Sequence, residues 1–188
     1  MNIGDVDSDL PPAVASRPHM PGYGIVAADA GAGLLHWAWA EERLVESHDF
    51  WVATLHPDGR PHVMPVWAVW RHGALWFSSS VQSRKYRNLC VDPRCTATTD
   101  DPHHPVVLEG RVTIVTEAVE IGRFLDASNA KYGVDYEPEF LDPVVNATFR
   151  LDPDWAFALD DEDFTGTPTR WTFDRGGRMR HFDRRGRQ

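Results

Sequence analysis

The sequence predicts a mainly β protein, a small closed or partly closed β-barrel with helices packed against its outside. Three observations support this fold class. The chain has 188 residues, which suits one sizeable domain. Its apolar segments are short and end at turn sequences, and two or three segments of helical composition lie between them. The hairpin turns are too short for parallel crossovers, and no G-x-G-x-x-G follows the first strand, so a dinucleotide-binding βαβ fold is not expected.

The first half of the barrel is predicted as a helix followed by three antiparallel strands. The helix covers residues 34–47, where leucines and tryptophans mix with charged residues and neither Gly nor Pro interrupts. Turns join the strands, because Pro57 fixes φ at the start of the first turn and Gly59 accepts a positive φ near its end. The three strands are residues 50–55, 61–70 and 74–79.

The second half is predicted to alternate strands with two further helices. Ser83 begins a short helix that ends at Leu89, before the Asp92-Pro93 stop. A longer helix covers residues 118–132 and ends at Gly133. The strands are residues 94–99, 106–115 with a bulge at Gly110, 155–159 and 169–173, and the loops are the acidic segments 135–142 and 160–163.

The two ends of the chain differ in composition from the middle. Residues 1–33 are rich in Pro and Gly and poor in large apolar residues, so we expect a flexible N-terminal arm, either disordered or lying on the domain surface. We expect residues 34–173 to form the barrel domain. Residues 174–188 are basic and contain glycine, so we expect a disordered tail.

Bulk properties exclude several classes of function. The formal net charge is -9, which gives no general attraction to nucleic acid. No apolar run approaches the length of a membrane span, and no secretory signal is visible. Without such a signal, Cys90 and Cys95 are expected to be free thiols. We therefore expect a cytoplasmic protein with no nucleic-acid or membrane partner.

The stretch from Ser78 to Lys85 predicts an anion site. A strand runs into a serine-rich turn, and Ser83 then caps a helix whose first turn holds Arg84 and Lys85. Cations at the positive end of the helix dipole are unfavourable unless an anion neutralises them. Hydroxyls of Ser78 and Ser79 and free backbone N–H groups converge there, so a phosphate would suit the site. The alternative is a solvated surface turn.

The neighbouring strand offers a surface for a planar ring. Pro65 lies inside it and cannot donate to a ladder, so this strand is predicted at an edge or a bulge. Met64 and Trp67 supply soft and aromatic surface for a heterocycle, and Val63 and Val66 flank them. The alternative is an ordinary barrel strand with proline at its edge.

Two other kinds of chemistry are not expected. His103 and His104 do not have the spacing of a metal-ligand motif, and the acidic run 160–163 is best interpreted as a solvated loop, so no metal site is predicted. Ser78 to Ser80 lack a G-x-S-x-G elbow, which argues against a serine hydrolase. No catalytic acid or base is predicted.

Taken together, these segments resemble the pyridoxamine 5′-phosphate oxidase-like family, and within it the flavin/deazaflavin oxidoreductases that use coenzyme F-420. The resemblance extends over residues 34–173 and depends on the order and spacing of several motifs. These are residues 58–67 (DGRPHVMPVW), 75–78 (LWFS), 83–89 (SRKYRNL), 92–94 (DPR), Glu109-Gly110, Lys131-Tyr132 and Thr169-Arg170-Trp171-x-Phe173.

The resemblance implies a split β-barrel, like the FMN-binding proteins, that forms a homodimer with cofactor sites at the interface. It implies that Ser83, Arg84 and Lys85 hold the cofactor phosphate, with Ser78 and Ser79 beside it. The ring would lie against Val63, Met64, Pro65, Val66 and Trp67, while Arg170 and Trp171 would approach from the partner subunit. The C-terminal Arg motif of the vitamin B6 oxidases is not clearly reproduced, so that activity is not the first expectation.

Three functions follow from the resemblance and stay open at this point. The first is an oxidoreductase that transfers a hydride between coenzyme F-420 and an unsaturated small molecule. The second is an FMN-dependent oxidoreductase on the same fold. The third is a non-enzymatic flavin- or haem-binding protein. In the first two the cofactor supplies the chemistry, and the protein supplies position, a phosphate anchor and a dry face.

Overall fold

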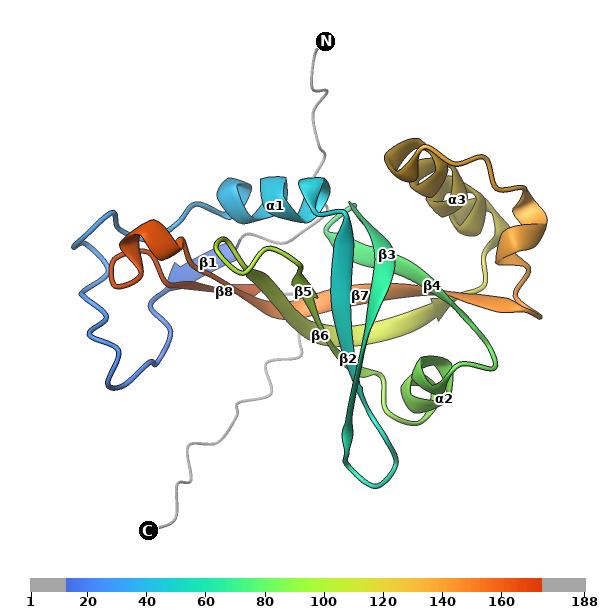
Figure 1. Cartoon of the computed structure of the whole chain (residues 1–188), viewed down its shortest axis with the longest axis horizontal. Coiled ribbons are helices and arrows are strands. Elements are labelled where there is room, and N and C mark those ends of the chain that lie inside the picture. Colours follow the sequence, from blue (N-terminus) through green and yellow to red (C-terminus); the bar gives the residue numbers. More distant parts are fainter. Residues whose placement is uncertain (1–12, 174–188) are drawn as a thin grey trace.

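The computed structural model describes residues 13–173, and its centre is a closed six-stranded antiparallel barrel (Figure 1). The strands follow the order β7-β4-β3-β2-β5-β6, and β6 pairs back with β7 to close the barrel. The mainly β split-barrel prediction is confirmed. The barrel strands are β2 (Asp49–Leu55), β3 (Pro61–Arg71), β4 (Ala74–Ser80), β5 (Arg94–Thr99), β6 (Val106–Val115) and β7 (Asn146–Ala158).

Two strands extend the sheet beyond the barrel. β8 (Thr169–Phe173) pairs with the end of β7, and β1 (Ala13–Ser16) pairs with β8. Arg17 then ties the following segment down, because its guanidinium donates to the carbonyl oxygens of Ala27, Ala30, Gly166 and Pro168. Residues 13–33 therefore lie along the domain. The predicted basic tail, residues 174–188, and residues 1–12 lie outside the described part of the chain.

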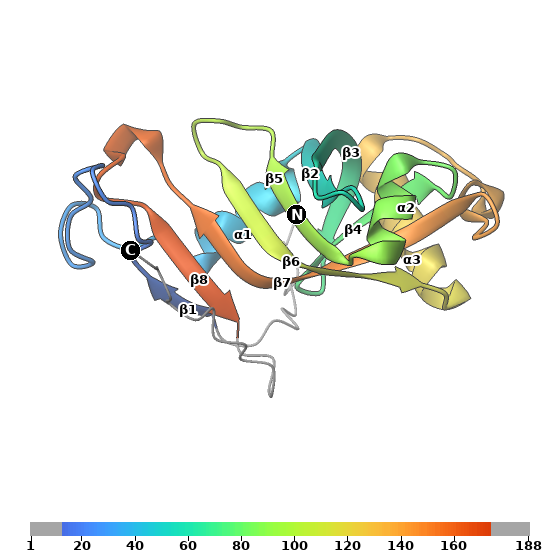
Figure 2. The ribbon, with the colours of Figure 1, turned by 90° about the horizontal axis from the view of Figure 1, so that it is seen from below.

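The helices lie outside the barrel, as predicted. α1 contacts β3 and β6, α2 contacts β2 and β4, and α3 contacts β3. Figure 2 shows α2 and α3 at one end of the molecule, with β1 and β8 at the other. None of the helices in residues 13–173 has the length and apolar character needed to cross a membrane. The helices are α1 (Trp37–Glu46), α2 (Arg84–Val91) and α3 (Ala118–Tyr132), with short 3-10 turns η1 (Pro138–Leu141) and η2 (Asp161–Asp163).

Two hydrophobic clusters stabilise this arrangement. The larger fills the barrel and includes Phe50, Phe77 and Phe149, whose side chains water does not reach. The smaller lies between the barrel and α3, where Trp76 packs against Phe124 with ring centroids 6.3 Å apart. This second cluster fixes α3 beside β3 and β4, the two strands that carry the predicted ring and phosphate contacts.

Most element boundaries follow the predictions, but one strand was predicted far too short. β7 begins at Asn146, whereas the sequence analysis expected a strand only at residues 155–159. Pro153 lies inside β7, and it is tolerated because it faces the bulge between Glu109 and Gly110 on β6. The predicted bulge at Gly110 is confirmed. The first helix begins at Trp37, three residues later than residue 34.

Candidate functional site

The loop from β4 to α2 is ordered by serine hydroxyls. Ser83 caps α2, and its Oγ accepts a hydrogen bond from the Tyr86 N–H at 3.0 Å. Ser79 Oγ lies 2.9 Å from Ser83 Oγ and fixes the cap against the end of β4. The predicted N-cap is thus confirmed. The remaining N–H groups of the first turn point out of the helix end, which carries the positive end of its dipole.

Lys85 lies in this first turn and is almost completely buried. Its exposed fraction is 7%, and it has no hydrogen bond or ion pair within residues 13–173. Burial lowers the pKa of the Lys85 ammonium below its ordinary value. A buried, unpaired ammonium is costly, because its charge loses hydration without gaining a partner. An anionic ligand would remove this cost, since it would supply the missing acceptor.

His62 lies close enough to Lys85 and Arg84 to respond to their charge. Burial is the main cause that lowers the pKa of His62, and the positive charges of His56, Lys85 and Arg84 lower it further. The first turn of α2 has no acidic residue. The N-terminal end of α2 therefore concentrates positive charge on a protein whose net charge is negative.

The strand opposite Lys85 has one free edge. β3 pairs with β2 along residues 61–67, but its pairing with β4 begins only at Ala68. Pro65 lies in this half-paired segment, which confirms the prediction that it occupies an edge. The free edge leaves the backbone from Pro65 to Trp67 available to a ligand.

Sequence reasoning missed the second wall, which comes from α3 and η1. Tyr136 and Phe140 stack with ring centroids 4.2 Å apart and an interplanar angle of 12°. Tyr132 stacks on Trp67 at 4.3 Å and 7°, joining this wall to β3. The available signal was a pair of aromatic residues four apart in an otherwise polar, acidic segment.

Hydrogen bonds lock α3 onto β3. The Tyr132 hydroxyl donates to the carbonyl oxygen of Ala68 at 2.9 Å and accepts from the Ala68 N–H at 2.7 Å. Lys131 Nζ donates to the same carbonyl at 2.8 Å. Burial raises the pKa of Tyr132 to about 12 and lowers the pKa of Lys131 to about 8. Both side chains therefore hold α3 against β3.

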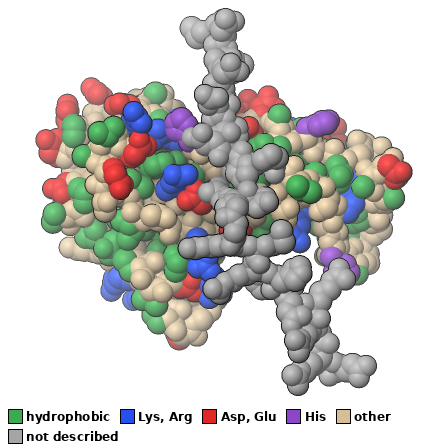
Figure 3. Space-filling model, turned by 180° about the vertical axis from the view of Figure 1, so that it is seen from behind, with side chains coloured by type: hydrophobic (Ala, Val, Ile, Leu, Met, Phe, Trp, Pro, Cys, Tyr) green, Lys and Arg blue, Asp and Glu red, His purple; other side chains and the backbone are tan. Residues whose placement is uncertain are grey.

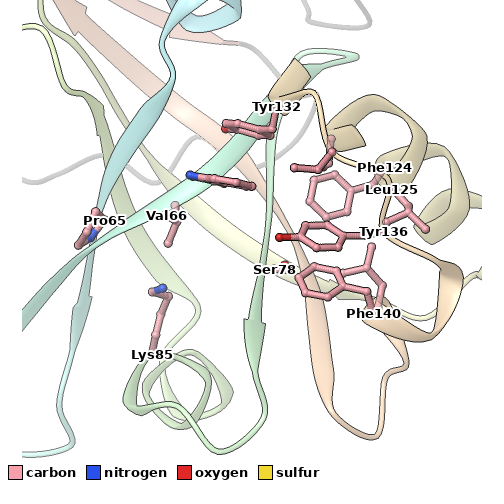
Figure 4. Close-up of a pocket in the computed structure, with 13 residues that line it drawn as sticks. Pro65, Val66, Ser78, Lys85, Phe124, Leu125, Tyr132, Tyr136 and Phe140 are labelled. Carbon is pink, nitrogen blue, oxygen red and sulfur yellow. The ribbon is translucent and has the colours of Figure 1, made fainter. Parts of the chain in front are cut away.

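Between the walls lies a cavity of about 270 Å³ (Figure 4). Figure 4 shows the Lys85 side chain pointing toward Pro65 and Val66, while the Tyr136 hydroxyl points inward from the opposite side. Among the described residues, those that line the cavity include no Asp or Glu. The lining residues are Pro65, Val66, Trp67, Ser78, Lys85, Phe124, Leu125, Ser128, Tyr132, Val134, Tyr136, Phe140 and Leu141.

Comparison with known proteins identifies the family. A family model described as pyridoxamine 5′-phosphate oxidase matches residues 39–159, more than half of the chain. The chain belongs to the pyridoxamine 5′-phosphate oxidase family. This family binds flavins such as FMN and includes oxidoreductases. No curated protein sequence matches this family member significantly.

Solved structures support the same fold. A conserved hypothetical protein from Mycobacterium tuberculosis has a TM-score of 0.60 and 24% identity, over 68% of this chain and 86% of that chain. A structure described as an F420 reductase has a TM-score of 0.51 and 26% identity, over 60% and 91%. A putative 5-nitroimidazole antibiotic resistance protein from Bacteroides thetaiotaomicron has a TM-score of 0.58 and 12% identity, over 87% and 92%.

The residues of this family member fit a flavin-type cofactor. A phosphate matches the Lys85 ammonium, which pairs with no described residue, and the outward N–H groups of α2. A planar ring matches the free edge of β3 and the indole of Trp67. The cavity therefore offers both ends of such a ligand a chemically suitable surface.

Of the twelve predicted cofactor residues, five line the cavity and two support it. The five are Pro65, Val66, Trp67, Ser78 and Lys85, and the two are Ser79 and Ser83, which order the turn. Val63 and Met64 lie on β3 as predicted, but exposed and outside the cavity, and Arg84 is exposed at the start of α2.

The two C-terminal residues lie elsewhere. Arg170 is exposed on β8, with its guanidinium over the ring of Trp155. Trp171 is 1% exposed and packs against Trp37 inside its own subunit, with ring centroids 5.4 Å apart. Trp171 is thus a core residue, and we correct its expected role as a contact to a partner's cofactor. Arg170 stays a prediction.

The structure also joins two loops that the sequence analysis treated separately. His104, Asp160 and Asp161 each offer a ligand atom, and these atoms lie within 4.8 Å of one another. The groups already pair with neighbours, because His104 Nδ1 lies 2.9 Å from Asp101 and Asp161 contacts His103. All are at least partly exposed. We assign no ion to them.

Proposed function

We propose that the protein is an oxidoreductase that uses coenzyme F-420 to transfer a hydride to or from an unsaturated small molecule. The single observation that carries the proposal is Lys85, a buried cation that pairs with no residue from 13 to 173 and lines a mostly apolar cavity. When bound, the deazaflavin ring supplies the hydride chemistry. The chain's own residues bind the phosphate, orient the ring and exclude water.

Each of these roles falls to a different part of the site. Lys85 and the N–H groups of α2 anchor the phosphate, which fixes the register of the cofactor along the cavity. Trp67 and the backbone at Pro65 and Val66 position the ring. Phe124 and Leu125 keep the opposite side dry, because both are almost fully buried.

FMN is the second candidate, and a specific observation favours each cofactor. The structure described as an F420 reductase shares 26% identity with this chain, which favours F-420. The family model is described as a pyridoxamine 5′-phosphate oxidase, which favours FMN. Both ligands carry a phosphate, so Lys85 has the same role with either. The expected cytoplasmic location also stays a proposal.

We further propose that the protein is a homodimer with its cofactor sites at the interface. The outer face of the β2–β3 hairpin exposes Trp51 and Val63 by 46% and 49%, and Pro65 and Trp67 are also exposed there. We call these four residues the hairpin patch. Pro65 and Trp67 belong to both the patch and the cavity. A subunit that covers the patch would therefore also approach the cofactor.

A binding titration tests the cofactor proposal. Purified full-length protein is titrated separately with F-420 and with FMN, and equilibrium binding is followed by absorbance and fluorescence. Lys85→Ala removes one charge-assisted hydrogen bond, worth about 1.5–3 kcal/mol, and should weaken binding about ten- to a hundredfold. Arg94→Ala is the matched control, because it removes the same charge from an exposed residue paired with Asp92.

The possible outcomes separate the candidate functions. Saturable binding of F-420 with weaker binding of FMN supports the first proposal, and the reverse supports FMN. Equal losses in Lys85→Ala and Arg94→Ala would show that general charge, and not the cavity, controls affinity. Cofactor that binds but never exchanges electrons with any acceptor would support a non-enzymatic flavin-binding protein.

A further inference from the structure

A second cavity of about 220 Å³ lies between the first half of α3 and η1. Its buried lining is apolar and includes Ile121, Leu125 and Leu141. Leu125 and Leu141 also line the first cavity, so these two side chains separate the two spaces. Gly122 lines the second cavity from α3, and a Cβ added there would meet no atom within 4 Å. The space is therefore open on this side of α3.

Exposed apolar side chains adjoin the second cavity. Val144 follows Pro143 of the cavity lining and is 80% exposed. Val119 is also exposed, and it lies three residues before Gly122, on the same side of α3. An apolar cavity bordered by exposed apolar side chains is typical of a surface that binds another molecule. We call this surface the α3 groove, and it consists of Val119, Ile121, Leu125, Leu141 and Val144.

The rim of the α3 groove is strongly acidic. Residues 116–145 contain seven Asp and Glu against two Arg and Lys, so this segment has a formal charge of -5. The whole chain has -9, so more than half of the net charge lies here. Glu117, Glu137, Glu139 and Asp142 are exposed at or beside the cavity lining. Figure 3, from behind, shows acidic and hydrophobic side chains interleaved at the end of the molecule that carries α3.

The acidic residues at η1 have no cation beside them. Glu120 on α3 pairs with Arg123 at 2.7 Å and with Arg71 at 3.5 Å. In contrast, Glu137 and Glu139 form no ion pair with any residue from 13 to 173. Uncompensated carboxylates around an apolar surface attract cations and repel anions. The rim therefore favours a positively charged ligand over nucleic acid, anionic lipid or a second copy of this same surface.

We propose that the α3 groove docks a basic peptide segment of a partner protein, with one apolar side chain in the cavity and Lys or Arg on the rim. The size of the cavity suits such an anchor, because an apolar cavity of about 150 Å³ already holds benzene. An apolar centre with a charged rim is the usual arrangement of a protein interface, and amphipathic peptides present both features on one face. This inference does not depend on which cofactor the protein binds.

Two synthetic peptides test the inference on full-length protein as purified. One contains leucine and lysine, with the leucines on one face of a helix, and the other has glutamate in place of lysine. Fluorescence anisotropy of the labelled peptides measures their affinities at low ionic strength. We expect the lysine peptide to bind saturably and at least about tenfold more tightly, because the rim repels the glutamates. Added salt should reduce this difference.

Two pairs of variants locate the binding site. Gly122→Leu puts a side chain into the cavity and should weaken binding at least about fivefold. Gly122→Ala is its matched control, because a methyl group leaves most of the space open. Glu137→Gln with Glu139→Gln should weaken binding about two- to tenfold, the loss expected for two exposed charge pairs. Glu46→Gln with Glu162→Gln is the second control, since it removes the same charge from exposed residues of α1 and η2.

Three results would overturn the inference. They are equal affinity for the two peptides, equal affinity of Gly122→Leu and Gly122→Ala, and equal losses in the two glutamine double variants. A different occupant would also be revealed, because residues 174–188 of this chain are themselves basic. If the lysine peptide bound only after the arginines of that segment were changed to glutamine, the groove would serve the chain's own terminus and not a partner protein.

Discussion

Lys131, which is partly buried, and Lys85, which is almost completely buried, differ in their partners. Lys131 donates to the Ala68 carbonyl at 2.8 Å, and the carboxylates of Asp100 and Asp49 partly offset the cost of burying its charge. Lys85 is more deeply buried, yet it has no hydrogen bond or ion pair with any residue from 13 to 173. Among the residues from 13 to 173, Lys131 has hydrogen-bond and charge partners and Lys85 has none, which supports the proposal that Lys85 pairs with a ligand. This contrast is why Lys85 carries the proposal and Lys131 does not.

Lys131 gives a pH-dependent prediction. Its folded pKa of about 8 lies below its ordinary value of 10.5, so between these values the unfolded chain holds a proton that the folded protein has released. Stability must therefore rise with pH across this window. Between pH 7.5 and 9.5, wild type should gain about 1 kcal/mol relative to Lys131→Met, after allowing for solvent screening of a partly exposed group.

Urea unfolding at the two pH values measures this gain. The comparison with Lys131→Met cancels other titrating groups, including Lys85, whose lowered pKa acts in the same direction. It also cancels the contribution of Tyr132, whose raised pKa of about 12 lowers stability as the pH rises above 10. A stability difference that stays constant from pH 7.5 to 9.5 would contradict the burial of the Lys131 charge.

At the level of single residues, sequence predicted the parts of the site that local rules determine. Ser83 followed from N-cap chemistry and Pro65 from its missing N–H, and both lie as expected. Tyr136 and Phe140 did not follow, because their role depends on α3 docking beside β3 across a long separation in sequence. Trp171 was misassigned because a sequence motif does not show which face of its strand is buried.

Among the elements, the sequence predicted the bounds of β6 but only the last part of β7, and the pairing of the two strands shows why. β6 alternates buried and more exposed residues over most of its length, and Gly110 correctly indicated its bulge. β7 contains Pro153 and acidic residues, which locally argue against a strand. Its pairing with β4 on one side and β6 on the other overrides this preference, because ten residues of β6 find partners along it.

The close approach at this bulge predicts a large effect of a single methyl group. A Cβ at Gly110 would lie 2.0 Å from the carbonyl oxygen of Asp152, and backbone would have to move to admit it. Gly110→Ala should therefore cost about 2–4 kcal/mol of unfolding free energy. Chemical denaturation followed by tryptophan fluorescence measures this cost.

A second glycine supplies the control for Gly110→Ala. Gly122 lies inside α3, and a Cβ there would meet nothing within 4 Å. Gly122→Ala should stabilise the protein by about 0.5–1 kcal/mol, because alanine loses less backbone entropy in a helix. If both variants had the same stability, the close packing of β6 on β7 at the bulge would be wrong.

For the molecule as a whole, the hairpin patch is an apolar surface that a single subunit leaves exposed. Trp51 lies directly opposite Pro65 in the β2–β3 ladder, and Val63 lies opposite Ala53, so these side chains share one face. Trp67 belongs to the same face and stacks on Tyr132 at the cavity. An aromatic and β-branched patch that borders a ligand site is typical of an interface that completes the site.

Charged substitutions in the patch should therefore affect assembly and cofactor binding together. Trp51→Glu or Val63→Glu should weaken the dimer by at least about 2 kcal/mol, roughly thirtyfold in its dissociation constant, because a carboxylate would be buried without a partner. Sedimentation equilibrium measures the dimer, and the F-420 or FMN titration measures the site.

Val119→Glu is the matched control, since Val119 is 67% exposed on α3 and lies outside the patch. A wild-type protein that is monomeric at all concentrations would contradict the homodimer. Monomeric patch variants that keep full cofactor affinity would show that one subunit suffices to form the site.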